Sequence, residues 1–529
     1  MYKKKIKSAL ISVFYKDGLD DIVRELDRLK VKIYSTGGTQ SFIEGLGVKV
    51  EAVEELTTYP SILDGRVKTL HPKVFGGILA KREASHTAQL EKFDIPEIDL
   101  VIVDLYPFEE TILKTKNEED IIEKIDIGGI SLIRAAAKNF QDVVVVPNRN
   151  DYATFLQILK ENNGYTKLDE RRYFAMKAFN VSSHYDTAIF KWFIEQEQGG
   201  EKTPNFIAEG SVELPPLTTN SFFKHSITQS EGLRYGENPH QSAVFFGDLS
   251  QMFETLSGKA LSFNNLVDVD GAVRLMREFR DDQPTFAILK HTNACGVATK
   301  KTLLDAWKTA LASDPISAFG GILICNKKMD AATAEEINKL FYEVLIAPEY
   351  SPEALEILRG KKQRILLRIK DFYQTSVSFK SLLNGVIQQD TDLKTETEKD
   401  LKFVTAKRPT EREIEDLLYA NICVKHLKSN GIAIVKNRQL ITMGCGQTSR
   451  VDALKHALEK AQNLGFDIKG AAMASEAFFP FPDCVEIAHK AGITSVIQPG
   501  GSVKDQDSID YCNANGLAMV MTGVRHFLH

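Results

Sequence analysis

A Lys-His pair ends a short apolar run near the middle of the chain, in the stretch FAILKHTNACG at 286–296. We expect a strand at 286–289, with Lys290 and His291 at its end and a polar turn at 292–296. Imidazole titrates near neutrality, and a neighbouring ammonium disfavours its charged form, so His291 suits proton transfer. A histidine packed under a loop beside a solvated lysine fits the same residues, and the stretch alone leaves both interpretations open.

A second group of ionisable residues lies in DGRVKTLHPKV at 64–74, which carries Arg66, Lys68, His71 and Lys73. So many cations in a structured loop suit an anionic ligand, whereas a solvated basic loop is the alternative. We expect Pro72 and the Gly76-Gly77 pair to keep this stretch in loop conformation.

Two glycine-rich loops suggest phosphate contacts. STGGT at 35–39 offers converging backbone N–H groups and hydroxyls before a short helix expected from Gln40, although a simple tight turn explains it equally well. It matches neither GxxxxGK[ST] nor GxGxxG. DIGG at 126–129 opens a helix that carries Arg134 and Lys138 on one face.

The elements that must position these loops form repeated strand-loop-helix units. We expect strands at 8–13, 31–34, 98–104 and 143–146, and helices at 19–29 and 170–195. This alternation predicts an α/β fold with a parallel sheet, in which ligands bind at the carboxyl ends of the strands.

Residues 196–218 are rich in Gly, Pro and charge, and we place a domain boundary there. The part that follows resumes an α/β texture in two halves, one around Lys290 and His291 and one from Asn430 to Arg450. We expect a strand at 322–325, a helix at 332–345 and a strand at 432–435. The highly charged segment 390–415 is interpreted as a solvated connection.

Composition restricts the function classes. A chain of 529 residues predicts two to four domains, and a formal net charge of -5 gives no overall attraction to nucleic acid or anionic membrane. No apolar run approaches the roughly 20 residues of a membrane span, and the start MYKKKIKSALISV does not read as a signal peptide. The six cysteines show no CxxC spacing, which suits a reducing cytoplasm and argues against a zinc site.

The motifs STGGT, DGRVKTLHPKV, DLYPF, DIGG, LRYGENPHQ, KHTNACG, SDPISAFGG, SNGIAI, GQTSRVDA, AFFPFPD and TGVRHF occur in this order. Together they resemble the AICAR transformylase / IMP cyclohydrolase family of purine biosynthesis, over essentially the whole chain. The resemblance implies a methylglyoxal-synthase-like cyclohydrolase domain at 1–198, a linker at 199–218 and a transformylase domain at 219–529. The transformylase would have two cytidine-deaminase-like α/β lobes without zinc, at about 219–390 and 391–529.

For the cyclohydrolase, the resemblance implies dehydrative closure of the formylated imidazole carboxamide ribonucleotide, FAICAR, to IMP. Lys68, Tyr106, Asp126 and Lys138 would surround the reacting groups, with Lys138 as the general acid/base. The other implied contacts to this nucleotide are Ser12, Lys16, Ser35, Thr36, Gly37, Gly38, Arg66, Thr69, Asp104 and Gly128.

For the transformylase, the resemblance implies formyl transfer from 10-formyltetrahydrofolate to the amine of AICAR. His291 would accept the amine proton, while Lys290 and Asn430 would stabilise charge on the formyl oxygen. The other implied substrate contacts are Arg234, Tyr235, Ser317, Gly320, Glu343, Phe478, Asp483 and Arg525. A cytoplasmic homodimer with transformylase sites between subunits, no metal, no nucleic acid and no membrane completes these expectations.

Three residues depart from the family pattern. Phe14 replaces a small hydroxyl residue, Phe75 replaces a histidine after HPKV, and Ala294 replaces a proline in the turn after the Lys-His pair. Two alternatives follow: a transformylase with an impaired cyclohydrolase, or a non-catalytic nucleotide-binding protein that uses the same pockets.

Overall fold

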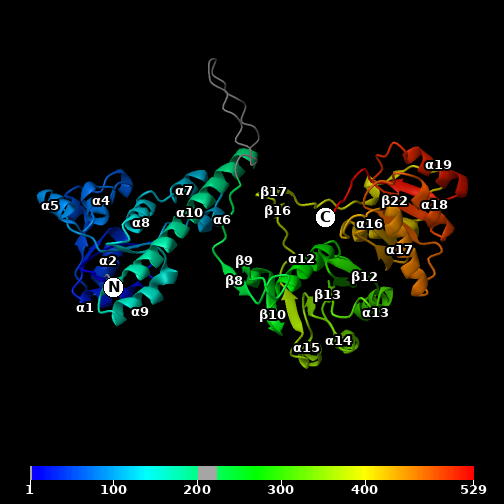
Figure 1. Ribbon diagram of the computed structural model, residues 1–529, viewed down its shortest axis with the longest axis horizontal. Coiled ribbons are helices and arrows are strands. Elements are labelled where there is room, and N and C mark those ends of the chain that lie inside the picture. The colour runs from blue at the N-terminus through cyan, green and yellow to red at the C-terminus, as the bar shows by residue number, and fades with distance from the viewer. Residues whose placement is uncertain (1–2, 200–222) are drawn as a thin grey trace, which may run out of the picture. The chain divides into compact units, whose positions relative to one another are not determined.

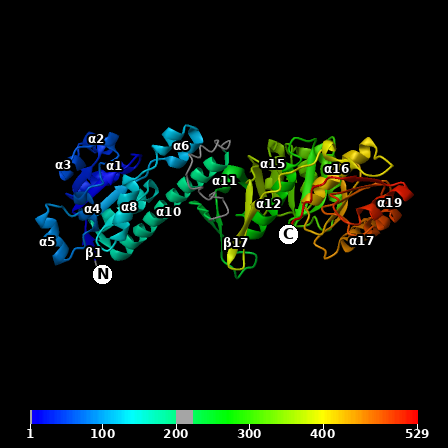
Figure 2. The same cartoon turned by 90° about the horizontal axis from the view of Figure 1, so that it is seen from above.

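The computed structural model describes residues 3–199 and 223–529. These residues form two units, one up to Thr228 and one from Gln229 to His529. The predicted linker at 199–218 lies outside the described residues from 200 onward. Figures 1 and 2 show the elements of each unit from two directions.

Unit 1 is built on a parallel sheet of five strands. In spatial order these are β4 (Glu51–Ala52), β3 (Lys32–Ser35), β2 (Ser8–Ser12), β5 (Leu100–Val103) and β6 (Val144–Val146). β5 and β6 are fully buried because helices cover both faces of the sheet. A separate antiparallel pair joins β1 (Lys3–Lys5) to β7 (Tyr165–Lys167). The predicted α/β class with a parallel N-terminal sheet is confirmed.

Ten helices of unit 1 surround this sheet in the described part of the chain. They are α1 (Leu19–Arg28), α2 (Gly37–Gly45), α3 (Val53–Thr57), α4 (Pro72–Leu79), α5 (Ala84–Lys92), α6 (Phe108–Lys114), α7 (Glu118–Ile122), α8 (Gly128–Lys138), α9 (Tyr152–Glu161) and α10 (Leu168–Gly199). The long α10 packs along α8 and β6 (Figures 1 and 2). Short 3-10 turns occur at Leu63–Gly65 and Arg149–Asp151.

Two loop predictions in unit 1 are wrong. The stretch from Pro72 to Gly77 is helical, because proline fits the first position of a helix and the side chain of His71 caps it by accepting from the Lys73 N–H. A Cβ on Gly77 would lie 2.4 Å from the Pro96 carbonyl oxygen, so the glycine permits close packing rather than a loop. Likewise α2 starts at Gly37, three residues before the predicted Gln40.

Unit 2 contains two sheets of six strands with the same order and the same strand directions. The first contains β10 (Phe253–Ser257), β15 (Ile365–Ile369), β14 (Val344–Ala347), β13 (Ile322–Cys325), β11 (Thr285–Lys290) and β12 (Asn293–Thr299). The second contains β18 (Lys402–Phe403), β23 (Ala518–Met521), β22 (Ser495–Gln498), β21 (Ala472–Ser475), β19 (Ile432–Val435) and β20 (Leu440–Gly444). The sequence predicts two α/β halves in this part of the chain, but it does not predict that their sheets have the same strand order.

The helices of unit 2 follow the duplication. α12 (Phe263–Arg277) and α16 (Glu411–Lys425) contribute to one core cluster shared by the two sheets. The outer faces pack on α13 (Leu303–Ser313), α14 (Ala331–Ile337) and α15 (Pro352–Arg359) in one lobe, and on α17 (Arg450–Asn463), α18 (Asp483–Lys490) and α19 (Asp505–Asn515) in the other. The predicted helix at 332–345 is wrong in its second half, because the buried run VLIA forms β14.

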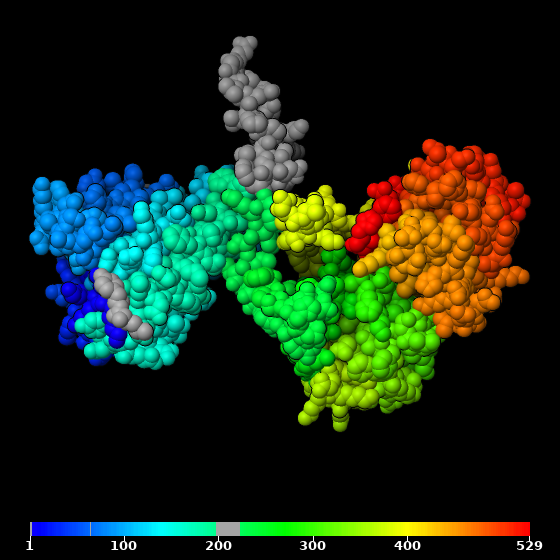
Figure 3. All heavy atoms as spheres, viewed as in Figure 1, coloured from blue at the N-terminus to red at the C-terminus, as the bar shows by residue number. Residues whose placement is uncertain are grey.

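Smaller elements complete unit 2: α11 (Leu249–Met252), the pair β8 (Ser230–Leu233) and β9 (Ala243–Phe246), and a 3-10 turn at Glu398–Asp400. The hairpin of β16 (Val377–Leu382) and β17 (Gly385–Asp390) pairs with no other described strand. Its yellow atoms stand out beside the green body of the first lobe in Figure 3.

Candidate active sites

A cavity of about 720 Å3 opens in unit 1 where β2, β3 and β5 end. Ser12 closes β2, Thr36 follows β3 and Asp104 follows β5, so three neighbouring strands deliver polar side chains to one edge. This is the edge at which ligands bind open parallel sheets.

One end of the cavity gathers hydroxyls, free helix N–H groups and an ammonium. The Ser12 Oγ and Thr36 Oγ1 atoms lie 3.0 Å apart, and α2 begins at the next residue, Gly37. The Lys68 ammonium lies 3.5 Å from the position that a Cβ on Gly37 would take. Such a combination of a cation and a helix N-terminus favours a phosphate group.

The loop after β2 is held rigidly around this end. Asp104 accepts hydrogen bonds from the backbone N–H groups of Phe14 and Tyr15. Burial raises the pKa of Asp104, whereas these hydrogen bonds favour its charged form. Lys16 donates to the carbonyl oxygens of Val13 and Phe14 at 2.5 and 2.9 Å, and burial lowers the pKa of Lys16.

The lining of the cavity also contains a carboxylate, Asp126, that acts electrostatically on a phenol, Tyr106. Asp126 precedes α8, and its Oδ1 accepts from the Gly129 N–H at 2.6 Å. Burial raises the pKa of Asp126, which strengthens it as a proton acceptor. Burial also raises the pKa of Tyr106, and the Asp126 charge adds to this, so the phenol stays neutral and can donate a hydrogen bond.

In unit 2, the Lys-His pair lies on a tight hairpin. β11 pairs with β12 through Lys290 and Asn293, which leaves only His291 and Thr292 in the turn, with φ of 50° and 66°. The predicted turn at 292–296 is therefore wrong, because most of it is the first half of β12. Asp268 of α12 fixes the turn by accepting from the Thr292 N–H at 2.7 Å, and the His291 side chain is exposed.

Lys290 points from this strand end to the neighbouring loop before β13. Its ammonium donates to the Phe319 carbonyl oxygen at 2.7 Å, and the next N–H, of Gly320, donates to the Phe341 carbonyl oxygen at 2.8 Å. Glu343 follows just before β14, donates its N–H to the Gly321 carbonyl oxygen, and forms an ion pair with Lys259 at 2.9 Å. Lys290, His291, Gly320 and Glu343 thus share one edge of the first sheet.

The second lobe holds Asn430 through a buried arginine. The Asn430 Nδ2 donates to the Gln447 carbonyl oxygen at 3.0 Å, and its Oδ1 accepts from Arg450 at 3.0 Å. Arg450 also donates to the Ser475 hydroxyl at 2.8 Å and pairs with Glu476 at 3.0 Å. Burial raises the pKa of Glu476, and the Arg450 charge opposes this rise.

The two lobes meet beside these residues. The Asn293 Oδ1, two residues after His291, accepts from the Lys428 N–H at 3.1 Å, two residues before Asn430. Within residues 223–529, however, no direct hydrogen bond or ring contact joins His291 to Asn430 or to Arg234.

Comparisons with known proteins are consistent along the chain. The profile described as "AICARFT/IMPCHase bienzyme" matches residues 136–460, and "MGS-like domain" matches residues 18–131. The chain belongs to the AICARFT/IMPCHase bienzyme family. It is 56% identical to the bifunctional purine biosynthesis protein PurH of Bacteroides thetaiotaomicron, over 99% of both chains. The PurH proteins of Acetivibrio thermocellus and Aquifex aeolicus are 46% and 44% identical, over 99% and 98% of this chain and 100% of theirs.

Most of the predicted cyclohydrolase residues of this bienzyme line the cavity of unit 1. They are Ser12, Lys16, Thr36, Gly37, Gly38, Arg66, Lys68, Thr69, Asp104, Tyr106, Asp126 and Gly128. Two others do not line it. Ser35 is fully buried and donates to the Ile11 carbonyl oxygen, and Lys138 is exposed at the far end of α8, roughly 15 Å of helix from Gly128.

The predicted transformylase residues fall into separate groups in the bienzyme. Lys290, His291, Ser317, Gly320 and Glu343 belong to the first sheet edge, whereas Asn430, Phe478, Asp483 and Arg525 belong to the second lobe. Arg234 and Tyr235 follow β8, where the guanidinium stacks 4.9 Å from the tyrosine ring centre. The sequence motifs assigned no role to Asp268 or Arg450. The one signal for Arg450 is its place at the end of the GQTSR motif.

Two further findings concern absences. Among residues 3–199 and 223–529, no group of three or more His, Cys, Asp and Glu side chains could hold a metal ion. No helix in the described part of the chain is both long and apolar enough to cross a membrane.

Proposed function

We propose that this chain catalyses the last two steps of IMP biosynthesis, formyl transfer to AICAR followed by ring closure of FAICAR. The observation that carries the proposal is the 56% identity to a PurH protein over 99% of both chains. The cavity of unit 1 and the Lys-His hairpin of unit 2 support it, because they supply one polar site for each step.

For the cyclohydrolase, we assign the phosphate to the end formed by Ser12, Thr36 and Gly37. Closure joins the carboxamide nitrogen to the formyl carbon and places negative charge on the formyl oxygen before water leaves. Lys68 stabilises this oxyanion, Asp126 accepts the amide proton, and Tyr106 donates a hydrogen bond. Lys138 remains the predicted general acid/base. Because it lies outside the cavity, this role needs a direct test.

For the transformylase, the amine of AICAR attacks the formyl carbon of 10-formyltetrahydrofolate, and His291 accepts the amine proton. Lys290 and Asn430 stabilise the formyl oxygen, and tetrahydrofolate leaves with a proton at its nitrogen. The hairpin suits this role because it fixes the backbone of His291 while its imidazole stays accessible.

The finer points of the proposal are a folate co-substrate, a cytoplasmic location and a homodimer with transformylase sites between subunits. The resemblance to the family supports the dimer; within one chain, the hydrogen bond from Lys428 to Asn293 already holds the loop before Asn430 beside the His291 hairpin. The impaired-cyclohydrolase alternative rests on the side chains of Phe14 and Phe75: the Phe14 backbone N–H donates to Asp104, and Phe75 packs on the core.

The test supplies AICAR and 10-formyltetrahydrofolate to the whole chain and follows IMP. We expect IMP from the wild-type protein and a fall in FAICAR formation of roughly 1000-fold in His291→Ala, the loss of about 4 kcal/mol of transition-state stabilisation. FAICAR that accumulates without IMP would favour the impaired cyclohydrolase. Background formylation that His291→Ala does not change would favour the non-catalytic protein.

A further inference from the structure

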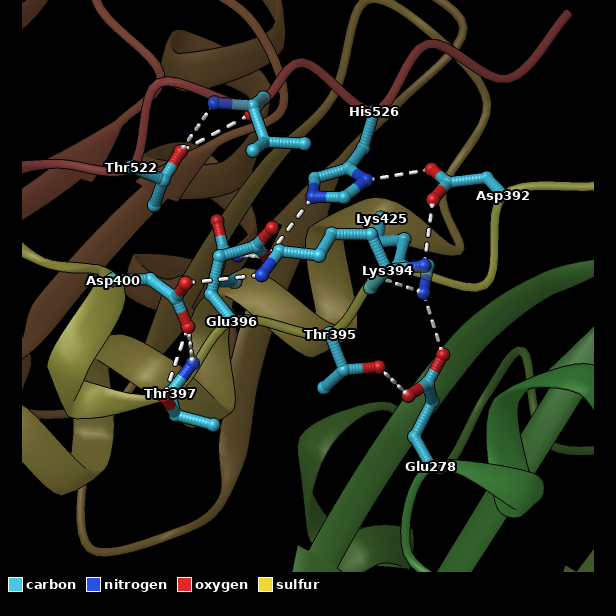
Figure 4. Close-up of polar contacts among 12 residues, drawn as sticks. Glu278, Asp392, Lys394, Thr395, Glu396, Thr397, Asp400, Lys425, Thr522 and His526 are labelled. Atoms are coloured by element: carbon cyan, nitrogen blue, oxygen red, sulfur yellow. Dashed lines mark hydrogen bonds and ion pairs between the residues drawn. The ribbon is translucent and has the colours of Figure 1, made fainter. Parts of the chain in front are cut away.

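The C-terminal tail that follows β23 buries a histidine between two carboxylates. His526 is 2% exposed, its Nδ1 lies 2.6 Å from Asp392 and its Nε2 lies 3.0 Å from Glu396. Figure 4 shows the ring aimed at both side chains, which come from the charged segment before β18. Since both ring nitrogens face acceptors, only the imidazolium satisfies both contacts.

The carboxylates around His526 are themselves fixed. Glu396 also accepts from Asn421 of α16 at 2.8 Å. Lys425 of α16 donates to the Lys394 carbonyl oxygen at 2.7 Å and to Glu278 at 2.8 Å, next to α12 (Figure 4). His526 and its two carboxylates, here called the His526 anchor, therefore tie the C-terminal tail to the connection between the lobes and to α12 and α16.

The electrostatics keep the ring charged. Burial opposes the charge, but the hydrogen bonds to Asp392 and Glu396 outweigh it and raise the pKa of His526 to about 9. Burial likewise tends to raise the pKa of Asp392, but the hydrogen bond from His526 and the charges of His526 and Lys425 lower it. Other ionisable groups nearby are Glu278 and His426, which contact each other at 3.2 Å, and Lys394 and Asp400, which form an ion pair at 3.0 Å.

The tail leads from this anchor to the proposed transformylase residues. The His526 N–H donates to the Glu476 carbonyl oxygen at 3.0 Å, and the Glu476 side chain holds Arg450, which holds Asn430. Two residues further, the Leu528 N–H donates to the Ser429 hydroxyl at 3.1 Å, and the Ser429 N–H donates to the Leu528 carbonyl oxygen at 2.9 Å. Arg525, the implied nucleotide contact, directly precedes His526.

We propose that His526 is a positioning residue of the transformylase site: held at both ring nitrogens, it fixes the tail so that Arg525 and the Ser429-Asn430 segment are in place for the substrate. The inference rests on the proposed function. His526 acts through its neighbours and touches no reacting atom.

The first test is His526→Gln in the full-length protein, with AICAR formylation and FAICAR closure measured separately. We expect the KM for AICAR to rise roughly tenfold or more, the effect of losing well-placed contacts to a charged group, while FAICAR closure stays unchanged. The matched control is His489→Gln, which removes a histidine of the same lobe that contacts Tyr511 at 3.1 Å, and which we expect to leave both activities unchanged.

The second test is Asp392→Asn, which leaves one carboxylate on the ring and moves the pKa of His526 back toward its ordinary value. We expect the KM for AICAR of this variant, relative to wild type, to increase as pH rises from about 6 to about 8.5, because only the variant loses the ring charge in this range. This readout decides the question even where His526→Gln fails to fold.

The proposal is overturned if His526→Gln leaves the KM for AICAR unchanged, or if Asp392→Asn follows the wild-type pH profile. It is also overturned if both activities of His526→Gln fall in parallel with its folded fraction, because that is a purely structural role. A wild-type protein without formylation would instead contradict the proposed function.

Discussion

Among single residues, the two lysines assigned to ring closure occupy different environments. Lys68 lies inside the cavity, where a Cβ on Gly65 would approach its Cε to 2.4 Å, so glycine gives its side chain a path to the phosphate end. Lys138 lies on the exposed surface at the other end of α8. Of these two lysines, therefore, Lys68 is the one that can reach a ligand in the cavity.

Replacing each lysine by methionine separates these assignments. We expect Lys68→Met to lower the cyclohydrolase kcat roughly 100-fold, about 2.7 kcal/mol, because a preorganised charge at the oxyanion is lost. Lys138→Met is expected to cause a smaller loss. Transformylase activity in the same preparation is the internal control. An equal loss from both variants would mean that Lys138 reaches the reacting atoms in a conformation other than this one.

The buried imidazolium of His526 also predicts how stability depends on pH. Its pKa is about 9 in the folded chain and near 6.5 when unfolded, so its stabilisation is fully present below about pH 6.5 and is lost as pH rises through about 9. The raised pKa of His526 contributes at most roughly 3 kcal/mol to the free energy of unfolding. Denaturant unfolding at several pH values should show the difference between wild type and His526→Gln shrinking across this window. A difference that stays constant would contradict the charged ring.

These residues show what the sequence could and could not predict. Lys68, Asp126 and His291 stand in recognisable motifs, so their placement in polar loops followed from local patterns. His526 lies 134 and 130 residues from Asp392 and Glu396, and no local pattern joins them. The high charge of the segment that carries both carboxylates predicts a solvated connection, yet Glu396 is only 6% exposed.

Among elements, the β11–β12 and β19–β20 hairpins of unit 2 have the same turn geometry but different side chains in the turn. In each lobe, an aspartate of the central helix holds a turn of two residues with positive φ: Asp268 holds the turn at His291-Thr292, and Asp416 holds the turn at Asn437-Arg438. The second lobe has Asn437 where the first has His291, so it keeps the geometry without the base. Sequence reasoning missed this repeat because only scattered residues are common to both lobes.

In each lobe of unit 2, a glycine of the edge strand packs closely against a helix. A Cβ on Gly296 in β12 would lie 2.0 Å from the Ala310 carbonyl oxygen of α13, and one on Gly444 in β20 would lie 1.9 Å from that of Ala453 in α17. We expect Gly296→Ala and Gly444→Ala each to lower the free energy of unfolding by about 1–3 kcal/mol, because backbone must shift. Gly385→Ala in β17, where nothing lies within 4 Å, is the matched control. Denaturant midpoints unchanged in all three variants would show that the strands and helices separate without cost.

At the scale of the whole molecule, the two proposed reactions belong to units with separate hydrophobic cores. The core of unit 1 contains residues from Ile6 to Ala178, whereas the shared core of unit 2 starts at Phe253. Composition predicts several domains, and the change of texture predicts a boundary at 196–218; the structure divides into two units after Thr228. Damage to one site is therefore expected to leave the other folded and active.

Two inactive variants should then complement each other when mixed. Lys68→Met retains formylation and releases FAICAR, and His291→Ala retains closure and consumes it. With AICAR and 10-formyltetrahydrofolate supplied, we expect the mixture to form IMP much faster than either variant alone, after a lag in which FAICAR accumulates in solution. The measurement is IMP formation over time, with each variant alone as the control. A mixture that forms no more IMP than the sum of the separate variants, although each retains its own half-reaction, would mean that closure accepts FAICAR only from a formylating site on the same molecule.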